Sequence, residues 1–231
     1  MSIVLMERCH ARQFKTAMIG APGIFQMISA RKINNVLRRI PPWLVYIVGA
    51  VPAFWFFYLG LTGGLGVEPI KPLEHELGRF SLKLLIVVLA VTPLRTMTGI
   101  NLIRFRRALG VLAFFYVVVH LLVWLFLDVQ IWDQIWKDIV KRPYITIGMV
   151  GFVLMLPLAV TSNNLFVRRM NAMAWKRLHW LTYPAIVLGG GHFVMVQKVW
   201  EAEPLIYLAV ISGLLALRLS PRRKRGVFSP G

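Results

Sequence analysis

The chain has 231 residues, of which 58% are hydrophobic and 16% are charged, and its formal net charge at pH 7 is +18. Such a large apolar fraction with so few charges excludes an ordinary soluble domain and indicates a single-domain integral membrane protein. A strongly basic chain can bind nucleic acid, but here the basic residues gather between apolar segments, which is typical of membrane topology. No nucleic-acid partner is expected.

Apolar segments in this chain approach the length of about 17–25 residues that a membrane-crossing helix needs. The second and last of them are short, and Trp and Tyr cluster near the segment ends, where the headgroup layer suits their amphipathic rings. The sequence therefore predicts an all-α, six-helix transmembrane bundle over residues 43–219, between a basic extension (1–42) and a basic tail (220–231). The predicted helices are residues 43–61, 80–94, 108–127, 144–160, 178–197 and 204–219.

Charged residues divide sharply between the predicted loops. Apart from Glu7, every acid lies in the first, third and fifth loops, whereas the second and fourth loops and the C-terminal tail carry only basic charges. Because Lys and Arg mark cytoplasmic loops, the second and fourth loops and both termini are expected to be cytoplasmic. The basic excess then reflects orientation, and it also suits contact with anionic lipid.

Three histidines, His120, His179 and His192, fall inside predicted membrane helices. A coordinating side chain at membrane depth is costly and indicates function by default. At 1.5 Å per residue, His120 lies roughly 18 Å from the inner end of its helix and His192 about 20 Å beyond His179, which lies near the inner end of the same helix. His120 and His192 therefore share a level, and two facing imidazoles at one level suit the axial positions of a b-type haem.

The interval of 13 residues between His179 and His192 does not place both side chains on one face of a regular helix. Pro184 and the glycines 189–191 could provide a kink or local over-winding. Glycine would also let a flat macrocycle approach the backbone, although the same residues would suit close helix packing.

Other roles are open for each histidine. A hydrogen-bonded core residue, or one that lines a water-filled cavity, would look the same in the sequence, and buried histidines can relay protons in a transporter. A transporter would favour acids within the helices and internal symmetry, and the six predicted helices contain no Asp or Glu. His75, between Glu74 and Glu76, is expected in the outer loop before the second helix, as a solvated residue or a haem contact.

Four motifs resemble one known family. They are GRF at 78–80, VTPLR at 91–95, RRALG at 106–110 and WKRLHWLTY at 175–183. Over about residues 31–218 the chain resembles the MsrQ (YedZ) family, the haem-binding membrane subunits of the bacterial periplasmic protein-methionine-sulfoxide reductase system. This family is part of the wider ferric-reductase-like transmembrane group.

The resemblance implies a non-catalytic electron-transfer subunit in the bacterial inner membrane. It would carry haem b, and also FMN as a flavoprotein, and would take electrons from the quinone pool or a cytoplasmic flavin reductase. Its acceptor would be a periplasmic molybdopterin subunit that repairs oxidised proteins. The family's ligand-associated histidines match His120, His179 and His192 as haem-iron ligands.

One departure concerns a second haem. Relatives in the ferric-reductase group place two histidines on each of two helices, but the position 13 residues before His120 is Arg107. A complete second bis-histidine haem is therefore not expected. His179 could instead pair with another group or serve flavin or quinone.

Basic residues near the inner ends of the helices are candidate contacts for FMN or another phosphate group, although they would also serve as topology determinants. These residues are Arg106, Arg107, Arg168, Arg169, Lys176 and Arg177. No Gly-x-Gly-x-x-Gly fingerprint occurs, so NAD(P)H is expected to be handled by another protein. The remaining alternative is another transmembrane haem carrier or a ferric reductase that acts directly on metal.

Overall fold

The structure is a computed structural model, and it describes residues 24–197 and 201–219. Helices and their connections make up this part of the chain, which contains no strand. The elements are α2 (Ile24–Arg39), α3 (Pro42–Leu61), α4 (Ile70–Thr98), η1 (Ile103–Phe105), α5 (Arg106–Val123), η2 (Trp124–Val129), α6 (Trp132–Lys141), α7 (Pro143–Val160), α8 (Asn164–Arg169), α9 (Ala172–Leu178), η3 (His179–Leu181), α10 (Thr182–Val196) and α11 (Ala202–Leu219).

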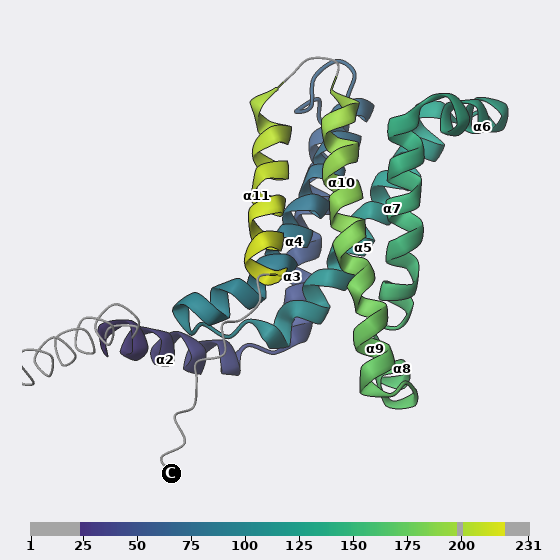
Figure 1. The fold of residues 1–231 in the computed structure, drawn as a ribbon. Helices are drawn as coiled ribbons and strands as arrows, with labels where there is room; N and C mark the ends of the chain where they lie inside the picture. Colours follow the sequence, from purple (N-terminus) through teal and green to yellow (C-terminus); the bar gives the residue numbers. More distant parts are fainter. Residues whose placement is uncertain (1–23, 198–200, 220–231) are drawn as a thin grey trace, which may run out of the picture.

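Helices α3, α4, α5, α7, α10 and α11 run side by side, while α2 lies across the lower end and α6 projects sideways from the upper end (Figure 1). We call these the α2 end and the α6 end of the bundle. The all-α membrane class is confirmed. Four stretches of the described chain are long and apolar enough to cross a bilayer: Pro42–Leu61, Ile70–Thr98, Ile103–Val129 and Pro143–Val160. Six crossings, with α10 and α11 completing the set, stays a prediction.

Apolar side chains lie on both the inside and the outside of the bundle. The main core joins α4, α5, α7, α10 and α11 through residues such as Leu89, Ala113 and Ile186. Large side chains along α3, including Phe54 and Leu61, are exposed. A continuous apolar surface of this kind suits lipid rather than water.

Helix α4 is much longer than the segment 80–94 that hydropathy predicts. It has 29 residues and contains Glu74, His75 and Glu76, so the expectation that His75 lies in a loop is wrong. The absence of acids from the helices is also wrong, because α4 and α11 begin before their predicted segments and include charged first turns. Hydropathy missed these turns because they lie at the α6 end, where charged side chains can reach the headgroup layer.

The predicted third and fourth loops contain short helices. Helix α6 occupies most of the third, and α8 and α9 occupy the fourth, each capped by an asparagine side chain that accepts a backbone N–H. Helix α2 lies within the predicted extension and is held to the α4–α5 connection through Asn34, which bonds Gly99 and Asn101. Residues 1–23, including Cys9, and the tail 220–231 lie outside the described part.

A tyrosine hydroxyl interrupts the hydrogen-bond ladder of α3. Tyr116, fully buried on α5, donates to the Gly49 carbonyl at 2.7 Å and accepts from the Ala53 N–H at 3.0 Å. Those two backbone groups would bond each other in a regular helix, and Pro52 beside them already lacks an N–H. The hydroxyl thus joins α3 to α5 at the place where α3 is weakest.

Replacing Tyr116 by phenylalanine is expected to lower the free energy of unfolding by about 1–3 kcal/mol, because two buried backbone groups lose their partner. Thermal unfolding of the purified protein in detergent measures this effect. Tyr58→Phe, at an exposed position on the same helix as Gly49, is the control and should change little. Equal melting temperatures for the two variants would contradict the role of the hydroxyl.

Candidate functional site

His120 on α5 and His192 on α10 come together near the α6 end of the bundle. Their ring centres are 6.3 Å apart and their ring planes cross at 81°. The two residues are far apart in sequence but were expected at one level, and the structure brings their rings side by side.

Each ring is fixed by a neighbouring helix. Nδ1 of His120 lies 2.8 Å from the carbonyl oxygen of Glu74 on α4, and Nδ1 of His192 lies 2.8 Å from that of Tyr144 on α7. A carbonyl oxygen can only accept, so both Nδ1 atoms carry the hydrogen and both Nε2 atoms keep a free lone pair. This arrangement orients an imidazole for metal coordination through Nε2.

A glycine makes room for each ring. A Cβ atom on Gly78 would lie 3.1 Å from His120 Nδ1, and one on Gly148 would lie 2.9 Å from His192 Nδ1. Each glycine lies four residues after the carbonyl that its histidine bonds, on the same helix. The two histidines are therefore seated in the same way on two different helices, a repetition that the sequence analysis missed.

The spacing of the rings can be compared with that of two ligands on one metal ion. Metal–imidazole bonds of about 2 Å would place the coordinating nitrogens of two facing rings about 4 Å apart, so ring centres 6.3 Å apart leave room for one metal ion between them. Among the described residues, no cluster of three or more His, Cys, Asp or Glu side chains forms a metal site. Two imidazoles suit an iron whose other four ligands come from a porphyrin.

His179 lies at the opposite end of the bundle and does not join the pair. Its ring stacks on Trp175 with 3.7 Å between ring centres, and its Nδ1 lies 3.0 Å from the Trp175 carbonyl oxygen. Helix α10 is continuous through glycines 189–191, where a kink or over-winding stays a prediction. A 3-10 turn, η3, precedes α10, and beside it Pro184 lacks the N–H that would bond Trp180 in an α-helix.

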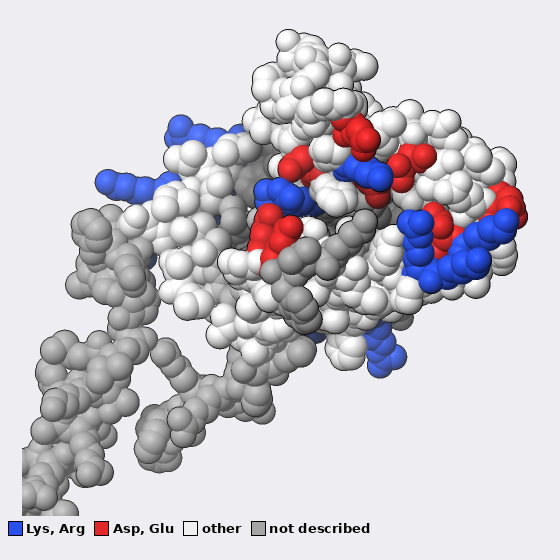
Figure 2. Space-filling model, turned by 90° about the horizontal axis from the view of Figure 1, so that it is seen from above, with Lys and Arg blue, Asp and Glu red and all other residues white. Residues whose placement is uncertain are grey.

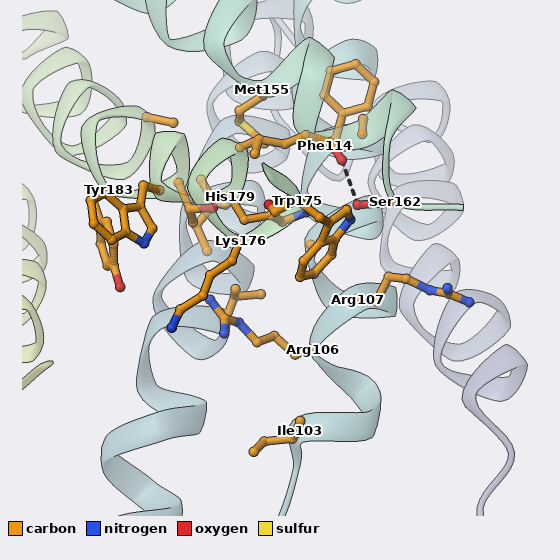
Figure 3. A pocket seen from close by; sticks show the side chains of 18 of the residues that line it. Ile103, Arg106, Arg107, Phe114, Met155, Ser162, Trp175, Lys176, His179 and Tyr183 are labelled. Atoms are coloured by element: carbon orange, nitrogen blue, oxygen red, sulfur yellow. Dashed lines mark hydrogen bonds between the residues drawn. The ribbon is translucent and has the colours of Figure 1, made fainter. Parts of the chain in front are cut away.

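A cavity of about 340 Å³ opens beside His179, within the size range of small-molecule sites. Three of the six predicted basic contacts, Arg106, Arg107 and Lys176, line it, together with Trp175 and His179 (Figure 3). Arg168, Arg169 and Arg177 do not line it. The sequence analysis missed Arg218 and Tyr183, because α11 returns to this site only in the folded chain.

The cavity wall is apolar and aromatic with several cations and no carboxylate. The Arg218 guanidinium lies 5.2 Å from the centre of the Tyr183 ring, a cation–π contact. Arg107 points away from the other cations (Figure 3) and donates to Asn164 at 2.6 Å. Cations in a largely apolar wall without matching acids suit an anionic ligand with a flat ring.

Acidic and basic side chains lie close together at the α6 end (Figure 2), and several of them form ion pairs. Arg79 contacts Glu76 at 3.0 Å and Glu203 of α11 at 3.5 Å. Asp138 of α6 is buried and lies 3.1 Å from Arg142.

Comparisons with known proteins agree with these features. A family model described as "Ferric reductase like transmembrane component" matches residues 77–190, from α4 into α10. The chain is 50% identical over 178 residues, 77% of its length and 80% of the relative's, to the protein-methionine-sulfoxide reductase heme-binding subunit MsrQ of Brucella anthropi. It is also 50% identical over 179 residues to the MsrQ of Brucella ovis, covering 77% of this chain and 81% of that relative. This chain therefore belongs to the MsrQ family of ferric-reductase-like transmembrane proteins.

Proposed function

We propose that this protein is the haem-bearing electron-transfer subunit of a protein-methionine-sulfoxide reductase, with His120 and His192 as the axial ligands of one b-type haem. The observation that carries the proposal is the seating of the two rings, 6.3 Å apart with both Nδ1 atoms bonded to backbone carbonyls. A haem held there would supply one-electron chemistry at a potential set by its ligands and burial. The chain itself supplies fixed ligands, an apolar surround and insulation from water.

The charges of the bundle support one orientation. The α2 end carries the basic loops, which favours an arrangement in which it faces the cytoplasm of a bacterial inner membrane, with cytoplasmic termini. The α6 end faces the periplasm, where a molybdopterin-containing catalytic subunit would accept electrons. The His120–His192 pair lies near this end, bonded to Glu74 in the second turn of α4 and to Tyr144 in the first turn of α7.

The cavity beside His179 is the proposed entry point for electrons. Its cations and aromatic wall would hold FMN, with the phosphate near Arg106, Lys176 and Arg218 and the ring against the aromatic side chains. Electrons would reach it from the quinone pool or from a cytoplasmic flavin reductase. Arg107, held by Asn164, would fix the start of α5 instead of contacting the phosphate.

Replacing Arg218 by glutamine is expected to weaken FMN binding about tenfold or more, because a charge-assisted hydrogen bond is lost. Arg106→Gln should act in the same direction. Arg168→Gln is the matched control, since Arg168 does not line the cavity. Titration with FMN, followed by flavin fluorescence, measures the affinities, and equal values for all three variants would contradict this site.

The experiment that tests the main proposal is a reduced-minus-oxidised visible spectrum of the purified protein with pyridine-haemochrome quantification. A b-type spectrum with about one haem per chain is expected for a single bis-histidine site. Crossed imidazole planes also predict a strongly anisotropic low-spin EPR signal. A protein that carries no haem, purified from cells supplied with it, would overturn the proposal.

A further inference from the structure

Helix α6 is strongly amphipathic for its length of 10 residues. At about 100° per residue, its apolar residues occupy one continuous arc and its charged residues the opposite one. The charged residues include Asp133, Lys137 and Lys141. The apolar arc consists of Trp132, Ile135, Trp136, Ile139 and Val140.

Only part of the apolar arc packs against the bundle. Ile135 is buried and Ile139 half-buried, in a cluster with η2 and α7. Trp132, Trp136 and Val140 are 73%, 69% and 67% exposed. Since they are spaced by four residues, they form one stripe along the helix, which we call the α6 stripe.

The orientation of α6 determines whether the α6 stripe faces lipid or water. Figure 1 shows α6 projecting sideways from the end of the bundle, beyond α7. Seen from above that end, charged side chains gather at the edge that α6 occupies (Figure 2). On the charged arc, Asp133, Lys137 and Lys141 are exposed, whereas Asp138 is buried against Arg142. The α6 stripe is exposed as well, as are Val150 and Val153 of the adjoining helix α7.

We propose that α6 lies in the membrane interface at this end of the bundle, with the α6 stripe inserted at the boundary between headgroups and acyl chains. Tryptophan favours that layer, and an amphipathic helix with lysines on its polar face is typical of interfacial binding. Lys137 and Lys141 are exposed and can reach lipid phosphates.

The size of the stripe favours lipid over a protein partner. Large aromatic side chains bury about 150–250 Å² each, so the stripe offers roughly 500 Å² at most. A stable protein interface buries about 800 Å² on each side. Helix α6 is also pinned at both ends, because η2 ends at Val129 and α7 begins at Pro143.

This placement would fix the depth of the histidine pair. His192 bonds the carbonyl of Tyr144, the second residue of α7, which lies three residues after the end of α6. With α6 in the interface, the two imidazoles lie about one helical turn, roughly 5 Å, below the membrane surface. The inference about α6 itself does not depend on haem binding.

The test uses spin labels on the full chain in phosphatidylethanolamine–phosphatidylglycerol vesicles. Cys9→Ser removes the single natural cysteine, and one cysteine is then introduced at 132, 136 or 140, or at 133, 137 or 141. Collision with oxygen and with a water-soluble nickel chelate is measured for each label. Val153→Cys on α7 is the lipid control and Glu68→Cys, in the α3–α4 connection, is the aqueous control.

Labels on the α6 stripe should collide more with oxygen than with nickel, as at Val153, and the three labels on the charged arc should behave like Glu68. Nickel collision along the stripe equal to that at Glu68 would overturn the proposal and leave the stripe as a protein-docking surface.

If labelled chains fail to insert, Trp fluorescence of the unlabelled chain in vesicles with lipids brominated near the headgroups replaces the measurement. The double variant Trp132→Phe/Trp136→Phe should then show a smaller fraction of tryptophan fluorescence quenched by the brominated lipid than the unaltered chain. An unchanged quenched fraction would overturn the proposal. A haem spectrum of every sample separates this result from the proposed function, since an inserted stripe in a haem-free chain would contradict only the latter.

Discussion

The His192→Ala variant is expected to lose haem from the paired site while still inserting into the membrane. Mutations of residues that merely orient a ligand cost about 10–100-fold in metal affinity, so removal of an axial ligand should cost more than about 100-fold. His120→Ala should behave in the same way, because each ring provides one of the two axial bonds. Haem content per chain, from pyridine haemochrome, is the measurement.

His75→Ala is the matched control for these variants. His75 lies on α4 at the same end of the bundle, one residue after Glu74, while the close ring contact joins His120 and His192. If His120 and His192 are the two ligands, this variant should keep its haem. Full haem in His120→Ala or His192→Ala would disprove the axial pairing, and loss in His75→Ala alone would move the ligand to α4.

Gly148→Ala should displace the ring of His192 although it changes no ligand. The new Cβ would lie 2.9 Å from Nδ1 and 3.0 Å from Cε1 of the imidazole. The ring cannot move away without breaking its bond to the Tyr144 carbonyl, so either the bond or the ring position is lost. We expect haem affinity to fall by about 10–100-fold. Overpacking should also lower the free energy of unfolding by about 1–3 kcal/mol.

Gly78→Ala should act on His120 in the same direction with a smaller effect, because its Cβ would lie 3.1 Å from Nδ1. Gly213→Ala on α11 is the control, since a Cβ there meets nothing within 4 Å. The EPR signal gives a second readout, because a tilted imidazole changes the angle between the ring planes. Identical affinity and signal in Gly148→Ala and Gly213→Ala would contradict the seating role.

Most of the fold could be predicted from hydropathy, and the errors of that prediction have a common cause. Segments 43–61 and 144–160 match α3 and α7 almost residue for residue, because their ends coincide with the ends of the apolar runs. The start of α4 was missed because its first turns are charged. Helix α6 was missed because an interfacial helix alternates polar and apolar residues with the helical period and never forms an apolar run.

Part of the candidate site could also be predicted from the sequence. Depth along a helix follows from residue counting, so the common level of His120 and His192 could be inferred. The seats of the two rings could not, since Gly78 and Gly148 lie on helices whose packing against α5 and α10 is a tertiary property. Arg218 joins the cavity beside His179 only because α11 returns along α4 and α10.

The repeated seating of the two histidines makes their geometry depend on helices that carry no ligand. His120 belongs to α5 but takes its direction from α4, and His192 belongs to α10 but takes its direction from α7. An iron bound between them would connect the helix pair α4–α5 with the pair α7–α10. Any tilt of α4 or α7 would then change the orientation of an imidazole ligand and so the ligand field of the iron. Sequence variation near Glu74 of α4 and Tyr144 of α7 would therefore tune the reduction potential of a haem held by His120 and His192, while both ligands stay unchanged.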